Sequence, residues 1–73
     1  MIIDKESINT ARGSNEGWIV MAEGDGINES IGCDIDTKEG VLDFLTSFTD
    51  NKEALAEFLP DSDYTKVTRL YVD

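Results

Sequence analysis

The sequence contains no histidine, one cysteine, one proline and only six lysines and arginines. Without histidine there is no ordinary zinc site and no imidazole that could act as a general base. A single cysteine cannot form an internal disulfide, which is typical of a protein in a reducing cytoplasm. The longest apolar run spans the five residues 18–22, far fewer than the ~20 of a transmembrane helix. The first residues, MIIDKES, lack the basic and apolar regions of a signal peptide, so we expect a cytoplasmic protein.

What the sequence has in excess is negative charge. Sixteen aspartates and glutamates give the 73-residue chain a formal net charge of −10. Such a charge repels nucleic acid and anionic membranes and attracts basic protein surfaces. Leu, Ile, Val and Phe make up 19 of the 73 residues, more than the ~20% typical of disordered chains. We therefore expect one folded domain, 1–73, whose small core would gain stability from dimerisation.

Hydrophobic periodicity predicts an α+β fold in the order β-β-β-α-α-β. Residues 1–8 fit either a short strand or a turn of helix leading into one, and 12–17 read as a loop. Three segments rich in β-branched and aromatic residues are predicted strands, with 24–29 as the hairpin connection between the first two: 18–23, 30–36 and 64–72. The expected sheet is antiparallel, with three or four strands and both helices on one face.

The two predicted helices share a pattern, because KEGVLDFLT at 38–46 and KEALAEFLP at 52–60 repeat at a spacing of 14 residues. The first helix is expected over 38–48, capped by Asp36 or Thr37. The TDN stretch at 49–51 breaks it, and Asp50 caps a second helix that ends at Pro60. One unbroken helix is the alternative, since a shift of two heptads keeps the faces aligned.

Carboxylates are the candidate site residues. Asp34 and Asp36 would share one strand face at ~7 Å, and the other pairs would lie one helical turn apart at ~6 Å. These separations are on the scale of neighbouring phosphates in nucleic acid. We predict a partner-binding surface built from three pairs and four flanking residues: Asp34, Asp36, Glu39, Asp43, Glu53, Glu57, Asp25, Glu29, Asp61 and Asp63. The alternative is an acidic face that is merely solvated.

Other kinds of site fit less well. A hydrolase needs two carboxylates in a cleft, one of them desolvated, whereas these pairs fall on exposed faces, so we predict no enzyme. Cys33 would share the apolar face of its strand with Ile31 and Ile35, so it is expected to be a buried structural thiol. Residues 34–45 begin like a calcium-binding loop, but Lys38 and Leu45 occupy ligand positions, so no metal is predicted. The glycines form turns rather than a phosphate loop, and no cofactor is expected.

The aromatic residues Trp18, Tyr64 and Tyr71 have two readings. In a domain this small they pack in the core or on the sheet, but aromatic side chains are also the commonest interface anchors. A second hypothesis is therefore a structural or adaptor module that assembles through a strand edge or an apolar patch around Trp18 or Tyr71. A third, a small acidic enzyme or metal-binding domain, would need a cleft that the sequence does not reveal.

The segments CDIDTKEGVLDFL and DNKEALAEFLPDSD, in a tiny acidic chain without histidine, resemble the DNA-mimic proteins of bacteriophages. The nearest likeness is to the phage inhibitors of the nucleoid protein HU, followed by acidic anti-CRISPR proteins. Such proteins share no signature motif, so the resemblance implies a mechanism and not individual residue roles. It implies that the protein occupies the DNA-binding cleft of a basic host protein, HU-like or a CRISPR effector, inside the infected bacterium. DNA is then excluded without any chemistry. We expect the protein to act as a homodimer.

Overall fold

The computed structural model describes all 73 residues, and its four strands and helical segments confirm the predicted α+β class. One segment is an α-helix and three are short 3₁₀ helices. In chain order the elements are β1 (Ile2–Asp4), η1 (Lys5–Asn9), β2 (Trp18–Gly24), β3 (Ile27–Ile35), α1 (Lys38–Thr46), η2 (Lys52–Glu57), η3 (Tyr64–Lys66) and β4 (Val67–Val72). Of the two readings of residues 1–8, the short strand is confirmed by β1, and the helical turn η1 follows this strand instead of leading into it.

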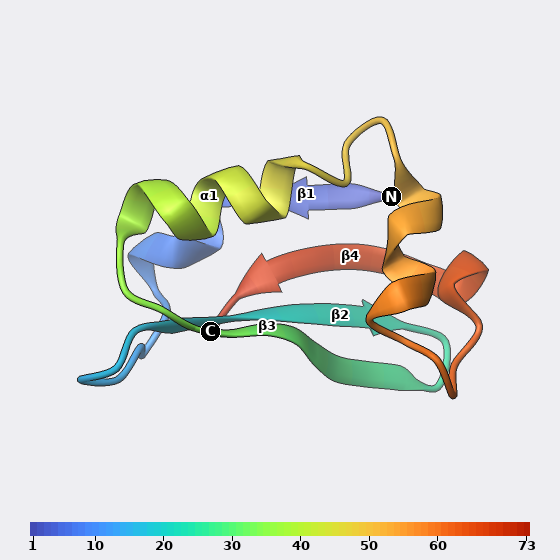
Figure 1. Cartoon of the computed structure of the whole chain (residues 1–73), viewed down its shortest axis with the longest axis horizontal. Helices are drawn as coiled ribbons and strands as arrows, with labels where there is room; N and C mark the ends of the chain where they lie inside the picture. The colour runs from blue at the N-terminus through green and yellow to red at the C-terminus, as the bar shows by residue number, and fades with distance from the viewer.

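The sheet has the strand order β1-β4-β2-β3 and is mixed rather than wholly antiparallel. β2 pairs antiparallel with β3 and with β4, as expected. β1 pairs parallel with β4, so the two arrows point the same way in Figure 1. Two strands joined by a short hairpin must run antiparallel. β1 and β4 lie at the two ends of the chain and are connected by all the elements between them, so they can pair in parallel. The prediction of a wholly antiparallel sheet is therefore wrong at this edge.

The β2–β3 hairpin is tighter and less regular than predicted. Its connection is the two-residue turn Asp25–Gly26, and β3 already begins at Ile27. The pairing shifts register twice within β3, and Asp34 adopts a left-handed φ of 59°. Each bulge adds one residue to a strand and disturbs the alternation of its side chains. Cys33 is consequently exposed, which corrects its prediction as a buried thiol.

One hydrophobic cluster fills the space between the sheet and the helical segments. Figure 1 shows α1 running along the sheet, with η2 at the end where β2 finishes and β4 begins. Residues from every layer are fully or almost fully buried in this cluster: Ile8, Val20, Ala22, Ile27, Ile31, Val41, Leu45, Phe48, Leu55, Leu59, Val67, Leu70 and Val72. Val41, Leu45, Phe48, Leu55 and Leu59 from the two predicted helical stretches therefore supply core residues, whereas Phe58, which the same periodicity predicts to face inward, is 39% exposed.

The break at 49–51 is confirmed, because α1 and η2 are separate elements. Thr37 rather than Asp36 caps α1, its hydroxyl accepting a hydrogen bond from the backbone N–H of Gly40 at 3.0 Å. The predicted cap by Asp50 is wrong. Asn51 precedes η2 and makes no side-chain capping bond. The second stretch forms a short 3₁₀ helix, Lys52–Glu57, instead of the predicted α-helix.

Ser7 is the single buried polar residue of the chain, and we expect its hydrogen bonds to stabilise the fold. Its hydroxyl accepts from the backbone N–H of Val72 at 2.7 Å and donates to the carbonyl of Asp4 at 2.6 Å. Ser7→Ala should lower the free energy of unfolding in urea by about 1–3 kcal/mol, because it leaves a buried donor unpaired. Ser47→Ala, which removes an exposed hydroxyl, should change it much less. Equal effects of the two variants would contradict this role of Ser7.

Candidate acidic interface

All ten carboxylates predicted from the sequence are exposed: Asp25, Glu29, Asp34, Asp36, Glu39, Asp43, Glu53, Glu57, Asp61 and Asp63. None of them takes part in an ion pair within the chain. The two ion pairs that exist share Arg69, whose Nη2 lies 2.6 Å from Asp4 Oδ2 and whose Nη1 lies 3.7 Å from Glu23 Oε2. The pairing with Asp4 also raises the pKa of Arg69 above its ordinary value. The negative charge of the ten carboxylates is therefore not neutralised by the protein's own cations.

Glu39 and Asp43 keep the spacing that the sequence predicts. Both lie within α1, four residues apart, and both are exposed. Residues at this separation are neighbours on an α-helix. Glu39 stands in the first turn of α1, where the helix dipole favours a negative charge. This pair is the regular part of the acidic surface.

Asp34 and Asp36 do not form the regular strand pair that was predicted. Asp34 adopts the left-handed conformation at the irregular end of β3, and Asp36 lies beyond Ile35, where the strand ends. Two-residue alternation holds only along regular strand backbone. Both carboxylates are still exposed, but their separation is no longer set by two strand rises.

Glu53 and Glu57 lose their predicted stacking as well, because η2 is a 3₁₀ helix. With three residues per turn, side chains four apart point about 120° away from each other. In an α-helix they would lie one above the other. The two repeated stretches thus bury similar apolar residues but do not present their carboxylates in the same arrangement.

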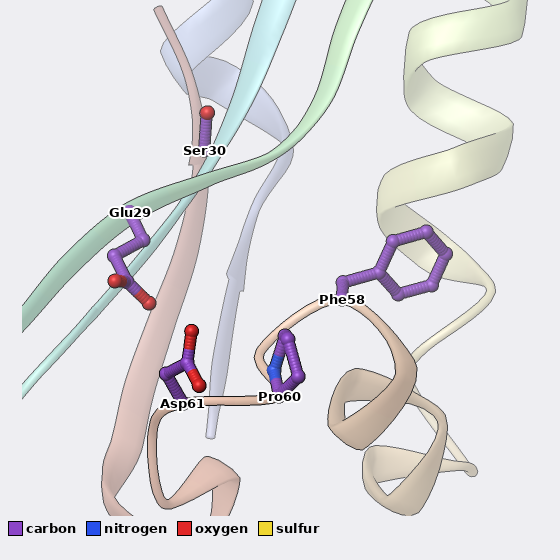
Figure 2. A pocket seen from close by; sticks show the side chains of 5 residues that line it. All are labelled: Glu29, Ser30, Phe58, Pro60 and Asp61. Carbon is purple, nitrogen blue, oxygen red and sulfur yellow. The ribbon is translucent and has the colours of Figure 1, made fainter.

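Two flanking carboxylates meet in a groove that the sequence did not indicate. Glu29 of β3 and Asp61 line a groove of about 400 Å³ together with Ser30, Phe58 and Pro60. Figure 2 shows the carboxylates of Glu29 and Asp61 directed toward one another on one side of Pro60, with Phe58 on the other side and its ring directed toward α1. A signal for it was present in the FLPD stretch, where a proline separates an aromatic residue from an acidic one. What the sequence lacked was the position of β3 beside that stretch.

Asp25 lies in the β2–β3 turn, and Asp63 caps η3. The Asp63 carboxylate accepts hydrogen bonds from the hydroxyl and from the backbone N–H of Thr65. These two bonds, the hydroxyl first, hold the pKa of Asp63 below its ordinary value. Asp63 is thus an ionised residue with a local structural role.

The aromatic candidates divide between the core and the sheet. Trp18 and Tyr64 are half-buried and pack against the hydrophobic cluster. Tyr71 is also half-buried, but its ring lies 4.3 Å from the guanidinium of Arg69, and its hydroxyl donates to Asn28 Oδ1 at 3.3 Å. Tyr71 is therefore the aromatic residue placed on the sheet face that carries the ion pairs.

The arrangement offers no constellation of three acidic or cysteine side chains that would hold a metal ion. No helix combines the length and the apolar character needed to cross a membrane. Comparison with protein-family models, curated proteins and solved structures finds no match. What the protein does is therefore inferred from the chemistry of its own surface.

Because Asp63 accepts these hydrogen bonds, we expect the stability of the folded protein to depend on the ionisation of its carboxylate. Because its pKa in the folded protein lies below the ordinary 3.8, Asp63 contributes stability above that pH, and this contribution is lost as the pH falls through the lowered pKa. Thr65→Ala removes the hydroxyl and should raise the pKa of Asp63 toward 3.8 in an NMR titration of its carboxyl carbon. Thr68→Ala, a hydroxyl that bonds a backbone carbonyl instead, should leave that pKa unchanged. An unaltered titration in Thr65→Ala would contradict this account.

The exposure of Cys33 predicts that its thiol is accessible in the native protein. A disulfide reagent such as dithiobis-nitrobenzoate should titrate one thiol per chain without denaturant, at a rate similar to that in urea. Reaction only after unfolding would show that the thiol is buried after all.

Proposed function

We propose that this protein is a non-enzymatic inhibitor that occupies the basic DNA-binding surface of a host protein and competes with DNA for it. The observation that carries the proposal is the set of ten exposed carboxylates, none paired with a cation of the chain. A DNA-binding protein owes much of its affinity to lysines and arginines that contact phosphates. The same side chains attract an acidic surface, which occupies the site without any reaction.

The summed charge supports this proposal more than any regular spacing does. Only Glu39 and Asp43 keep a regular helical separation, so a continuous track of phosphate-like charges is not needed for the mechanism. A net charge of −10 on 73 residues accelerates the encounter with a basic partner. The carboxylates lie on a folded scaffold, so less conformational entropy is lost on binding than with a disordered acidic tail.

The partner class follows from this chemistry and from the resemblance to phage DNA mimics. It is a basic protein of the bacterial cytoplasm, either a nucleoid protein like HU or a CRISPR effector. Nucleic acid and anionic membranes are disfavoured as partners because both carry the same charge sign. A homodimer of this chain would double the acidic area presented to such a partner.

An adaptor module is the second candidate, and one observation favours it. On the sheet face that carries Arg69 and Tyr71, Ile2 is 63% exposed, and Met21 is only half-buried. Exposed apolar side chains on a sheet that has two strand edges, β1 and β3, suit assembly with another protein. Such binding would be insensitive to salt and would be lost in Tyr71→Ala.

Competition with DNA tests the proposal directly. The protein should displace a labelled DNA duplex from purified HU, followed by fluorescence anisotropy. Its affinity for HU should fall roughly tenfold or more between about 50 and about 200 mM salt, because the binding is electrostatic. For another target, a lysate pull-down at low salt should release a basic protein on addition of DNA. Salt-independent binding, or capture that DNA cannot reverse, would exclude the DNA-mimic mechanism.

Charge reversal locates the surface. The double variant Glu39→Lys/Asp43→Lys should abolish binding to the DNA-binding partner while circular dichroism shows a retained fold, since both residues are exposed. The matched control Glu6→Lys/Glu16→Lys changes the net charge equally at two exposed residues outside the predicted surface. It should retain most of the affinity. Equal losses in both variants would mean that net charge alone, and not this surface, drives binding.

A further inference from the structure

The groove beside β3 combines features that a solvated acidic face does not have. Phe58 on its wall is 39% exposed, and the other large hydrophobic side chains with such exposure are the two N-terminal residues Met1 and Ile2. Exposing a phenylalanine inside a folded chain forgoes the stabilisation of its burial. A side chain that covers this ring would recover it.

The Phe58 ring is held in place by two neighbours. It packs edge-to-face against Phe44 at 5.5 Å and against Phe48 at 5.8 Å between ring centroids. Pro60, which also lines the groove, has a fixed φ and restricts the backbone of Leu59 before it. The apolar wall is therefore largely preformed and needs little ordering when a ligand arrives.

The acidic end of the groove is built from two separate parts of the chain. Glu29 comes from β3, and its Oε2 accepts a hydrogen bond from the Ser62 hydroxyl at 2.9 Å. Asp61 follows Pro60, and its carboxylate is directed toward that of Glu29 (Figure 2). Neither carboxylate has an ion-pair partner in the chain. Both carboxylates are exposed and open to a cation from a partner.

We propose that this groove receives one arginine side chain of the basic protein partner, as the anchor of the interface. This inference rests on the proposed function and identifies one contact between the protein and its partner. The guanidinium lies between Glu29 and Asp61, and the aliphatic stem runs along Pro60 and Phe58. Charge complementarity selects a cation, and the planar guanidinium with its five N–H donors can bond both carboxylates at once. A lysine ammonium is a compact charge that is more strongly hydrated and matches this arrangement less well.

A single-arginine peptide tests the groove separately from the partner. Titration of the ¹⁵N-labelled protein with acetyl-Gly-Arg-Gly-amide should shift the backbone amide signals of Ser30, Phe58 and Asp61 most strongly. Glu29→Gln/Asp61→Asn keeps the shape of the groove but removes its charge, and should weaken peptide binding about tenfold. Glu6→Gln/Glu16→Gln removes the same charge elsewhere and should change it less than about twofold. The lysine counterpart of the peptide should bind more weakly than the arginine peptide.

Three results would overturn the inference: shifts spread over all acidic segments, equal weakening by the two double variants, or equal binding of the lysine peptide. Its failure can be told apart from failure of the proposed function. A protein that displaces DNA from HU but shows no arginine site at the groove keeps its function and loses this anchor. A groove that binds the peptide, in a protein that neither displaces DNA nor releases a partner to DNA, keeps the arginine site and loses the DNA-mimic mechanism.

Discussion

The contact among Phe44, Phe48 and Phe58 is the interaction on which the helical layer depends. The three rings meet edge-to-face at 5.2 to 5.8 Å between centroids, and they join α1 and the residues after it to the C-terminal side of η2. Phe44 also lies against β3, where a Cβ on Gly32 would come within 2.6 Å of its ring. A glycine at this position lets the helix approach the sheet closely. Through Phe44 this contact links β3 to Phe58, one of the residues that line the groove.

The fold must also hold together despite a net charge of −10. It does so by keeping the candidate carboxylates in water, where repulsion is screened, and by tying the chain ends to the sheet with specific bonds. Arg69 on β4 links Asp4 of β1 to Glu23 of β2, and Ser7 after β1 bonds the backbone of Val72. Arg69 is the one cation that forms ion pairs, and the carboxylates of α1, η2 and the groove have no ion-pair partner in the chain. An acidic surface free to bind a partner follows from this distribution.

The site could be predicted only in part from the sequence. Exposure of the ten carboxylates was predictable, because charged side chains rarely lie in a core. Their arrangement was not, because each predicted pair assumed an ideal repeat. Asp34 lies in a bulged strand end and Glu57 in a 3₁₀ helix, so only Glu39 and Asp43 keep the assumed geometry. The predicted burial of Cys33 is wrong for the same reason. It assumed that side chains alternate regularly between the two sheet faces, and bulges disturb this alternation.

The sequence by itself determined the α+β class, the position of most elements, the break between the helices and the sign of the surface charge. These follow from local periodicity, turn residues and composition, which act over a few residues. The tertiary structure alone decided the parallel pairing of β1 with β4, the form of the second helix and the meeting of Glu29 with Asp61. Each of these depends on segments far apart in the chain: β1 and β4 are its two ends, and Glu29 and Asp61 are separated by α1 and η2. No local pattern specifies such contacts, because they form only when the whole core packs.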